Sequence, residues 1–221
     1  MALSASTGLI ELVQDSTSLD KLYARPDYAG SLTKHFEQCY GPQGEPTFET
    51  ARLNFIESCA GAAFVCYALG LKDRHNGNIL LDCKGRLVHI DFGFCLGLAT
   101  GGAFSLERAP FKLTRDHVAL MGGSTSRGFE RFVQAFADAL VCARTVLDET
   151  SALIEIMQFK SSYPCFQGKA DATAPFRKRH FPHLTEPQLR VKARSLVHQS
   201  LDSTGTYLYD VFQFKTNQVQ Y

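Results

Sequence analysis

The sequence has no excess of charge of either sign: 23 Lys and Arg residues stand against 22 Asp and Glu, a net charge of +1. A balanced chain has no overall positive field, so composition gives no reason to expect nucleic-acid binding. The seven cysteines are odd in number and contain no Cys-x-x-Cys pair. We expect free thiols in a reducing compartment, with Cys59, Cys66 and Cys142 buried on apolar helix faces.

Long hydrophobic runs are also missing. The longest, residues 59–71, is too short to cross a bilayer and ends in Lys72-Asp73-Arg74. Residues 1–8 have neither the basic flank nor the apolar core of a signal peptide. With 45% hydrophobic and 20% charged residues, the 221 residues suit one ordinary domain or one lobe of a larger one. This composition excludes a disordered chain and a disulfide miniprotein.

Apolar periodicity predicts a mostly helical chain with one hairpin. A strong helix begins after Thr47, which can cap it, and continues through Tyr67. A polar loop follows, and then two short apolar runs, 79–81 and 87–90, flank the turn signal 82–85 and predict a β-hairpin. Residues 8–13 read as a short strand leading into a connector, and 93–109 as a mobile loop. Further helices are predicted over residues 114–121, 129–147, 151–159, 185–201 and 207–217, with Thr185 and Gln188 forming a capping box.

The segment from Asp73 to Gly93 contains the residues with the clearest chemical pattern. Asp73 and His75 lie in the polar loop, where either can orient or deprotonate a hydroxyl group. Asn78 and Asp91 have the neutral and charged oxygens that suit Mg²⁺, and the hairpin would bring them side by side. Phosphoryl transfer requires positioned phosphates, a metal and a proton acceptor, so the segment indicates that chemistry.

Two motifs give this segment a family resemblance. Asp91-Phe92-Gly93 is the metal-binding triplet of kinases. Asp73-Arg74-His75, followed by Asn76-Gly77-Asn78, reverses the His-Arg-Asp order of ordinary protein kinases. In this order and at this separation, the motifs resemble the phosphatidylinositol 3/4-kinase superfamily. That resemblance implies an α+β fold, the mostly helical C-terminal lobe of a kinase-like fold with a small β-hairpin at the active site.

Other segments narrow the resemblance to the beta-type, type III phosphatidylinositol 4-kinases. They are residues 54–61, 110–114, 121–123 and 164–166. The resemblance covers essentially the whole chain and is weaker over residues 19–46 and 168–182. It implies a lipid kinase that makes phosphatidylinositol 4-phosphate from phosphatidylinositol in a membrane surface.

The resemblance also implies a role for each motif residue. Asp73 and His75 would be the acid/base pair of the catalytic loop, and Arg74 would brace that loop or bind phosphate. Asn78 and Asp91 would be ligands of Mg²⁺, or of Mn²⁺ in its place.

The same resemblance places the adenine of ATP. Residues 8–13 are similar to the family's hinge, where backbone groups at Glu11 and Val13 would hold the base. Leu80 and Ile90 would form the floor beneath it; the alternative for both is ordinary hairpin core.

The activation loop, residues 89–114, is the part that selects the headgroup in this family. A polyphosphorylated headgroup needs a cluster of cations, and the loop offers only Arg108 and Lys112. This favours plain phosphatidylinositol, and it does not separate a 4-kinase from a 3-kinase.

Half of a complete kinase has no counterpart in the sequence. Nothing before Gly8 can supply a phosphate-covering loop, and the first lysine is Lys21. We therefore expect a C-lobe alone, with the N-lobe absent, a hinge at 8–13 and a catalytic loop at 70–78. Residues 1–221 by themselves should be a poor enzyme.

Several alternatives to a phosphatidylinositol 4-kinase stay open. They are a phosphatidylinositol 3-kinase, a protein kinase of the superfamily, and a non-catalytic kinase-like module that binds a partner or membrane. The intact Asp73, His75, Asn78 and Asp91 favour an active ancestry. A cytoplasmic protein peripheral on endomembranes, with the Golgi suggested, is implied by the family alone.

Two features could contact a membrane. Residues 160–194 contain eight Lys and Arg against two acidic residues, a local charge of +6, and residues 177–180 could face an anionic leaflet. The aromatic residues of 207–221 could form an interfacial helix. The alternatives are a solvated surface for the first and packing on the lobe for the second.

Overall fold

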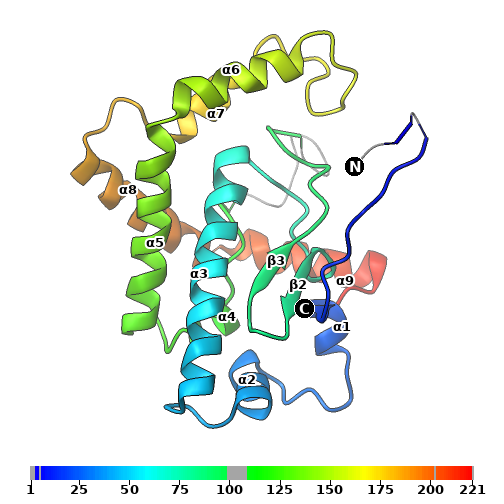
Figure 1. The fold of residues 1–221 in the computed structure, drawn as a ribbon, viewed down its shortest axis with the longest axis vertical. Helices are drawn as coiled ribbons and strands as arrows, with labels where there is room; N and C mark the ends of the chain where they lie inside the picture. Colours follow the sequence, from blue (N-terminus) through cyan, green and yellow to red (C-terminus); the bar gives the residue numbers. More distant parts are fainter. Residues whose placement is uncertain (1–2, 5, 99–108, 202, 221) are drawn as a thin grey trace.

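The computed structural model describes residues 3–4, 6–98, 109–201 and 203–220. Helices dominate this part of the chain, and a small antiparallel sheet lies beside them (Figure 1). The expected α+β class is confirmed. The elements are β1 (Ser16–Ser18), α1 (Leu19–Tyr23), α2 (Leu32–Tyr40), α3 (Pro46–Leu69), the 3₁₀ turn η1 (Asn76–Asn78), β2 (Ile79–Asp82), β3 (Leu87–His89), α4 (Arg115–Leu120), α5 (Arg127–Arg144), α6 (Leu147–Gln158), α7 (Thr173–Arg179), α8 (Glu186–Leu201) and α9 (Thr204–Asn217).

The long helix α3 is the centre of the lobe. It packs along α5, which in turn packs on α8, and the sheet contacts α3 on another side (Figure 1). Because neighbours surround it, α3 has buried residues at most of its turns. Pro46 begins it at a position where a missing N–H costs nothing. Gly70 ends it in the left-handed conformation, φ +60°, which turns the chain into the loop of interest.

Aromatic side chains fill the main core. Five phenylalanines are fully buried there, from α2, α3 and α5: Phe36, Phe48, Phe55, Phe132 and Phe136. A second, smaller core joins the segment after β3 to α6 and α7, and contains Leu96, Leu147, Ile154, Phe166, Ala172 and Phe176. The segment that follows β3 is therefore anchored to α6 and α7.

The predicted hairpin is confirmed. β2 and β3 pair antiparallel with Leu80 opposite Val88, and β1 adds a third strand on the other edge of β2. Residues 82–85 form the turn, in which the Gly85 N–H donates to the Asp82 carbonyl over 3.1 Å. The turn fixes the separation between the end of the polar loop and Asp91.

Several local predictions were wrong. Glu45, not Thr47, is the N-cap of α3, because helix formation begins at Pro46. Residues 9–13 form no strand and are exposed, and the N-terminal strand is β1 instead. Cys142 is exposed on α5, although Cys59 and Cys66 are buried and all seven thiols are free as predicted. The predicted mobile loop lies mostly in residues 99–108, outside the described residues.

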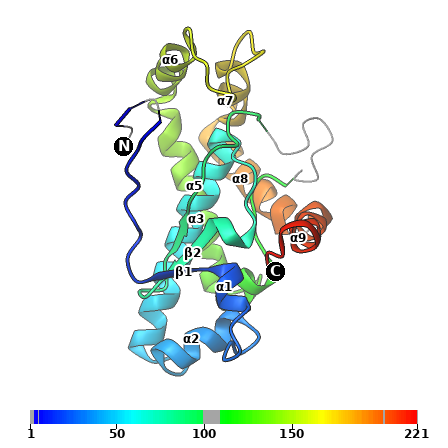
Figure 2. The same cartoon turned by 90° about the vertical axis from the view of Figure 1, so that its right-hand side faces the viewer.

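The two ends of the described chain lie on different sides of the sheet. Figure 2 shows residues 6–15 running along one side of the molecule and α9 along the other. The hairpin lies between them.

Candidate active site

The polar loop between α3 and β2 has an irregular backbone up to η1. Asp73 has φ +64° and Asp91, after β3, has φ +56°. These left-handed conformations are uncommon for residues other than glycine, and Asp and Asn tolerate them best. Two residues predicted to be functional therefore occupy unusual backbone positions in the two segments that meet here.

Arg74 joins these two segments. Its guanidinium donates to the Lys72 carbonyl over 2.9 Å, to the Ile90 carbonyl over 2.7 Å and to the Asp91 carbonyl. The residue is only 3% exposed and its guanidinium lies 5.7 Å from the centre of the Phe92 ring. Of the two roles expected for Arg74, these contacts are those of a brace within the protein.

Asp73 and His75 face one another. The His75 Nε2 lies 3.9 Å from Asp73 Oδ1, and both side chains are largely buried. His75 Nδ1 accepts a hydrogen bond from the Gly77 N–H over 3.1 Å. The neutral ring therefore has its proton on Nε2, directed at the carboxylate. A Cβ on residue 77 would lie 3.0 Å from the ring, so glycine permits this approach.

Asn78 and Asp91 are brought together by the backbone. The Ile90 N–H donates to the Asn78 carbonyl over 3.1 Å, and the Asn78 side-chain amide donates to the Asp73 carbonyl over 3.0 Å. Asp91 is exposed, and its Oδ1 accepts the Gly93 N–H over 3.2 Å. One amide and one carboxylate are the oxygen-bearing side chains by which Mg²⁺ is held in phosphoryl-transfer sites, together with water and phosphate oxygens.

The hairpin has a second, half-exposed face. Leu80 and Val88 are paired partners, and Ile90 is two residues beyond Val88, so the three share one face of the sheet. Ile79, Leu81 and Leu87 lie on the opposite face, in the core. The hairpin residues that form ordinary core are therefore those of the opposite face, and not Leu80 and Ile90. Val88 was missed, and strand alternation from Leu80 and Ile90 is the signal that would have included it.

The expected hinge residues are described but hold no regular structure. Glu11 is exposed and Val13 is 37% exposed, in an extended segment along the side of the molecule. The role expected of Glu11 and Val13 is for their backbone groups to hold adenine. The exposure of their side chains therefore does not test it.

α9 covers the polar loop from the other side. The Tyr209 hydroxyl donates to Asp73 Oδ1, and the Gln213 amide donates to the Tyr209 oxygen over 2.6 Å. The Asn76 amide donates to the Gln220 carbonyl over 2.9 Å. Sequence reasoning treated the aromatic residues of this helix as membrane or packing groups and missed the contact with Asp73. Their separation of 136 residues leaves no local signal.

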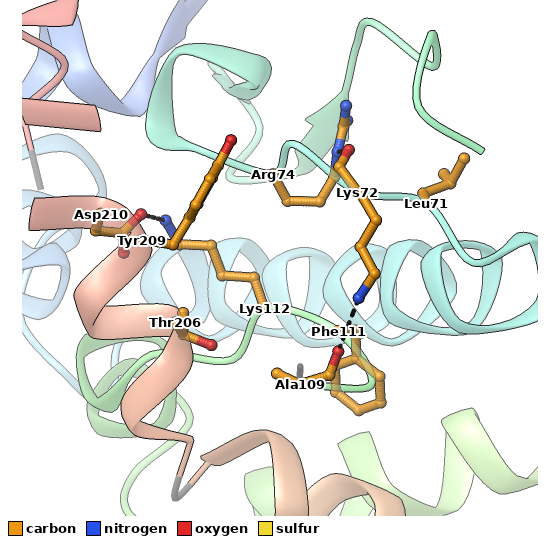
Figure 3. A pocket seen from close by; sticks show the side chains of 9 residues that line it. All are labelled: Leu71, Lys72, Arg74, Ala109, Phe111, Lys112, Thr206, Tyr209 and Asp210. Atoms are coloured by element: carbon orange, nitrogen blue, oxygen red, sulfur yellow. Dashed lines mark hydrogen bonds and ion pairs between the residues drawn. The ribbon is translucent and has the colours of Figure 1, made fainter. Parts of the chain in front are cut away.

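Arg108 and Lys112 are the two cations expected to contact a headgroup, and the structure describes only Lys112. Arg108 lies outside the described residues. The Lys112 ammonium is 2.6 Å from Asp210 Oδ1 and donates to Asn76 Oδ1 over 2.9 Å, with its side chain 4% exposed. Figure 3 shows Lys112 reaching toward Asp210 beneath the Tyr209 ring. Its charge is therefore compensated within the protein.

A small cavity of about 20 Å³ lies among these groups, room for about one water molecule. Three cationic side chains line it: Lys72, Arg74 and Lys112 (Figure 3). The Lys72 ammonium lies 3.4 Å from the Ala109 carbonyl. Sequence reasoning did not single out Lys72, although it directly precedes Asp73.

The predicted basic membrane patch is wrong for two of its four residues. Arg179 donates to the Ala68 carbonyl over 2.9 Å and His180 is 2% exposed. Arg177 forms an ion pair with Asp148 over 2.7 Å. Lys178 alone of the four is exposed, because α7 packs its other side chains against the lobe.

Neither a metal cluster nor a membrane-spanning helix stands out in the described part of the chain. No group of three or more His, Cys, Asp or Glu side chains there is placed to hold a metal ion. None of its helices combines the length and apolar character needed to cross a bilayer.

Comparison with known proteins gives consistent matches. The family described as "Phosphatidylinositol 3- and 4-kinase" matches residues 1–167. Phosphatidylinositol 4-kinase beta of Xenopus tropicalis is 38% identical over 219 residues, and that of Sorex araneus is 37% identical over 219. These matches include 99% of this chain and 27% of each relative. The chain thus spans about a quarter of the length of the relatives it matches.

Proposed function

Because the chain belongs to the phosphatidylinositol 3- and 4-kinase family, we propose that it supplies the catalytic and metal-binding half of a lipid kinase. The reaction is transfer of the γ-phosphate of ATP to the inositol 4-hydroxyl of phosphatidylinositol. The observation that supports this is the convergence of Asp73, His75, Asn78 and Asp91 through the hairpin and the Arg74 brace. The 4-position rests on the names of the relatives.

Asp73 and His75 act on the hydroxyl that attacks. As the inositol oxygen bonds to the γ-phosphorus and the bond to ADP breaks, the hydroxyl proton passes to the Asp73 carboxylate. The His75 Nε2–H lies beside that carboxylate and orients it or the transferred phosphate. Arg74 holds the catalytic loop against the segment of Asp91.

Asn78 and Asp91 are the proposed metal ligands. A bound Mg²⁺, or Mn²⁺, would neutralise phosphate charge at this site. Asp91 presents an exposed carboxylate, and Asn78 is held by its hydrogen bond to the Asp73 carbonyl. The metal site and the proton acceptor are therefore coupled through one side chain.

The nucleotide would lie on the half-exposed face of the hairpin. Leu80, Val88 and Ile90 form an apolar floor for adenine, and backbone groups at Glu11 and Val13 hold its edge. We propose the segment boundaries accordingly: hinge 8–13, catalytic loop 70–78 and activation loop 89–114, all in a C-lobe.

The lipid substrate requires the site to face a membrane surface. We propose peripheral binding to endomembranes on the cytoplasmic side, the Golgi being the organelle suggested by the family. Phosphatidylinositol is the partner that the family and the names of the relatives support. They define no regulatory proteins, and the balanced charge gives no support for nucleic acid.

Asp91→Asn in the protein at its native length tests the proposal. The change preserves the left-handed backbone and removes one negative charge, so we expect at least a hundredfold loss of phosphate transfer with the fold retained. The assay is headgroup-resolved chromatography of the products from vesicles of phosphatidylinositol in phosphatidylcholine. Asp27→Asn, an exposed aspartate in a surface pair with Arg25, is the matched control.

Each outcome decides a different part of the proposal. Substantial turnover by Asp91→Asn would refute the metal assignment. Phosphatidylinositol 3-phosphate as the product would refute the 4-position and leave the lipid kinase. No lipid product from the unaltered protein at its native length would favour the non-catalytic module.

A further inference from the structure

One face of α9 holds a chain of side-chain hydrogen bonds that ends on Asp73. The Asn217 amide donates to Gln213 Oε1 over 2.6 Å, and Gln213 Nε2 donates to the Tyr209 oxygen over 2.6 Å. The Tyr209 hydroxyl donates to Asp73 Oδ1. The three residues are four apart, so they share one side of the helix. The family match, residues 1–167, does not include them.

The direction of this chain follows from its chemistry. A carboxylate only accepts hydrogen bonds, so Tyr209 must use its single proton on Asp73. Its oxygen can then only accept from Gln213, and the Gln213 amide is oriented in turn by Asn217. The donors that fix the Asp73 carboxylate therefore come from α9, 136 residues away in the sequence.

The contact is buried and its position is fixed. Tyr209 is 4% exposed and Gln213 5% exposed, so water competes little for their hydrogen bonds. One residue along, Asp210 forms the buried ion pair with Lys112, which in turn contacts Asn76 in the catalytic loop. α9 is therefore attached to the same loop at two adjacent points.

A carboxylate that accepts a proton must be held in one orientation. The terminal torsion of aspartate is soft and roughly two-fold, and small misplacements of a reacting group cost large factors in rate. Asp73 Oδ1 accepts hydrogen bonds from the Tyr209 hydroxyl and from Gln213 Nε2 at 3.5 Å, and His75 Nε2 lies 3.9 Å away. These contacts restrict the position of Oδ1, and the Tyr209 hydroxyl makes the shortest of them.

We propose that Tyr209 is a positioning residue for phosphoryl transfer: its hydroxyl, oriented by Gln213, holds the Asp73 carboxylate in the orientation that accepts the proton of the substrate hydroxyl. This inference depends on the function proposed above for Asp73. It assigns α9 a part in the chemistry, beyond covering the loop.

Tyr209→Phe in the protein at its native length is the primary test. The ring is retained, including its stacking on Phe212 at 6.4 Å between centroids, and only the hydroxyl is lost. We expect kcat to fall about tenfold, equivalent to about 1.4 kcal/mol, with unchanged KM for ATP and for phosphatidylinositol vesicles. Tyr163→Phe, the same change at an exposed tyrosine, is the matched control and should leave kcat unaltered.

Gln213→Glu is the second variant. It is nearly isosteric but replaces the donor with an acceptor, so the single Tyr209 proton is shared between two carboxylates. We expect a fall in kcat similar to that of Tyr209→Phe. Thermal unfolding of each variant checks that the fold is retained.

A double-mutant cycle with Asp73→Asn, measured in single turnover, separates positioning from general structure. If Tyr209 acts through Asp73, Tyr209→Phe should lower the residual rate of Asp73→Asn by less than twofold. An additional tenfold loss in that background would overturn the inference, as would unchanged kcat in Tyr209→Phe. A rise in kcat would also overturn it, because α9 would then restrain the loop. Full activity of Asp73→Asn would instead refute the proposed function.

Discussion

The His117 side chain is buried and has no hydrogen-bond partner among the described residues, so protonating it should destabilise the fold. The side chain is 2% exposed in α4, its ring 5.6 Å from that of Phe55, and neither ring nitrogen has a hydrogen-bond partner among the described residues. Burial lowers the pKa of His117 to about 3, and the charges of Lys112 and His89 act in the same direction. The folded protein thus holds this ring in its neutral form.

The pH dependence of unfolding tests this environment. The imidazole titrates near 6.5 in an unfolded chain, so between about pH 6.5 and 3 the unfolded state binds more protons. The contribution of His117 to stability should therefore fall by about 2 kcal/mol as the pH is lowered from 7 to 5, and the lowered pKa of His89, about 4, adds a loss of the same sign. Urea unfolding at both pH values measures it. His117→Leu should reduce the loss, whereas His198→Leu, an exposed control, should keep it. Equal losses in both variants would show that other groups are responsible.

At the scale of elements, sequence patterns predicted the helices and the hairpin whose ends are set by nearby residues. The hairpin was found because turn residues 82–85 separate two apolar runs, and α4 begins after Thr114, whose hydroxyl accepts the His117 N–H over 3.2 Å. α7 was missed, because its seven residues become helical through packing of Phe176 in the second core. α1 and α2 were missed for a similar reason: both are short, and each is stabilised by packing on distant segments. α1 packs on η1 and the sheet, and α2 packs on α3 and α4.

The turn of the hairpin depends on a glycine that fits against α3. Gly85 has φ +81°, and a Cβ there would lie 2.8 Å from the Ala51 carbonyl oxygen. Gly44 also has a positive φ, +94°, but a Cβ there would meet no described atom within 4 Å. Both alanine variants bear the backbone cost, and Gly85→Ala alone adds the collision. We expect it to be less stable than Gly44→Ala by about 1 to 3 kcal/mol.

Chemical denaturation of the two alanine variants measures this difference. A shift of the midpoint with an unchanged slope indicates altered stability of the folded state. Equal midpoints would mean that the turn moves away from α3 without cost.

At the scale of the whole molecule, the site is assembled from segments that sequence reasoning could only partly connect. The two motifs and their separation predicted that Asp73, His75, Asn78 and Asp91 converge, because a hairpin joins them. The contacts of α9 with Asp73 and Lys112 depend on how the last helix returns across the lobe, and no local pattern encodes that path. The contact of Lys72 with the Ala109 carbonyl was missed for the same reason.

The charge balance of the assembled site predicts substrate preference. The proposed activation loop has Arg108 and Lys112, and Asp210 compensates the charge of Lys112. Each further phosphate on the inositol adds roughly −1.5 to −2 charge, so we expect phosphatidylinositol to be used at least tenfold faster than phosphatidylinositol 4,5-bisphosphate. Rates on vesicles of each lipid measure this preference.

Asp210→Asn should reduce the preference for phosphatidylinositol over the bisphosphate, because it leaves the positive charge of Lys112 uncompensated near the proposed activation loop. Glu130→Gln, which removes the acidic partner of Arg194 in a surface pair, should leave it unchanged. Preferred use of the bisphosphate by the unaltered protein would contradict the charge argument.

The left-handed backbone at Asp73 and Asp91 limits which residues can replace them during evolution. Asp, Asn and Gly are the residues that adopt φ near +60° at little cost, and here the angles are +64° and +56°. In a lineage that lost the chemistry, the backbone would still favour those three residues at both positions. Both the backbone and the proposed chemistry therefore favour aspartate at these two positions. In a copy of the gene that has lost kinase activity, we expect asparagine or glycine to replace it before any other residue. His75 and Asn78, which have ordinary backbones, would change more freely and earlier.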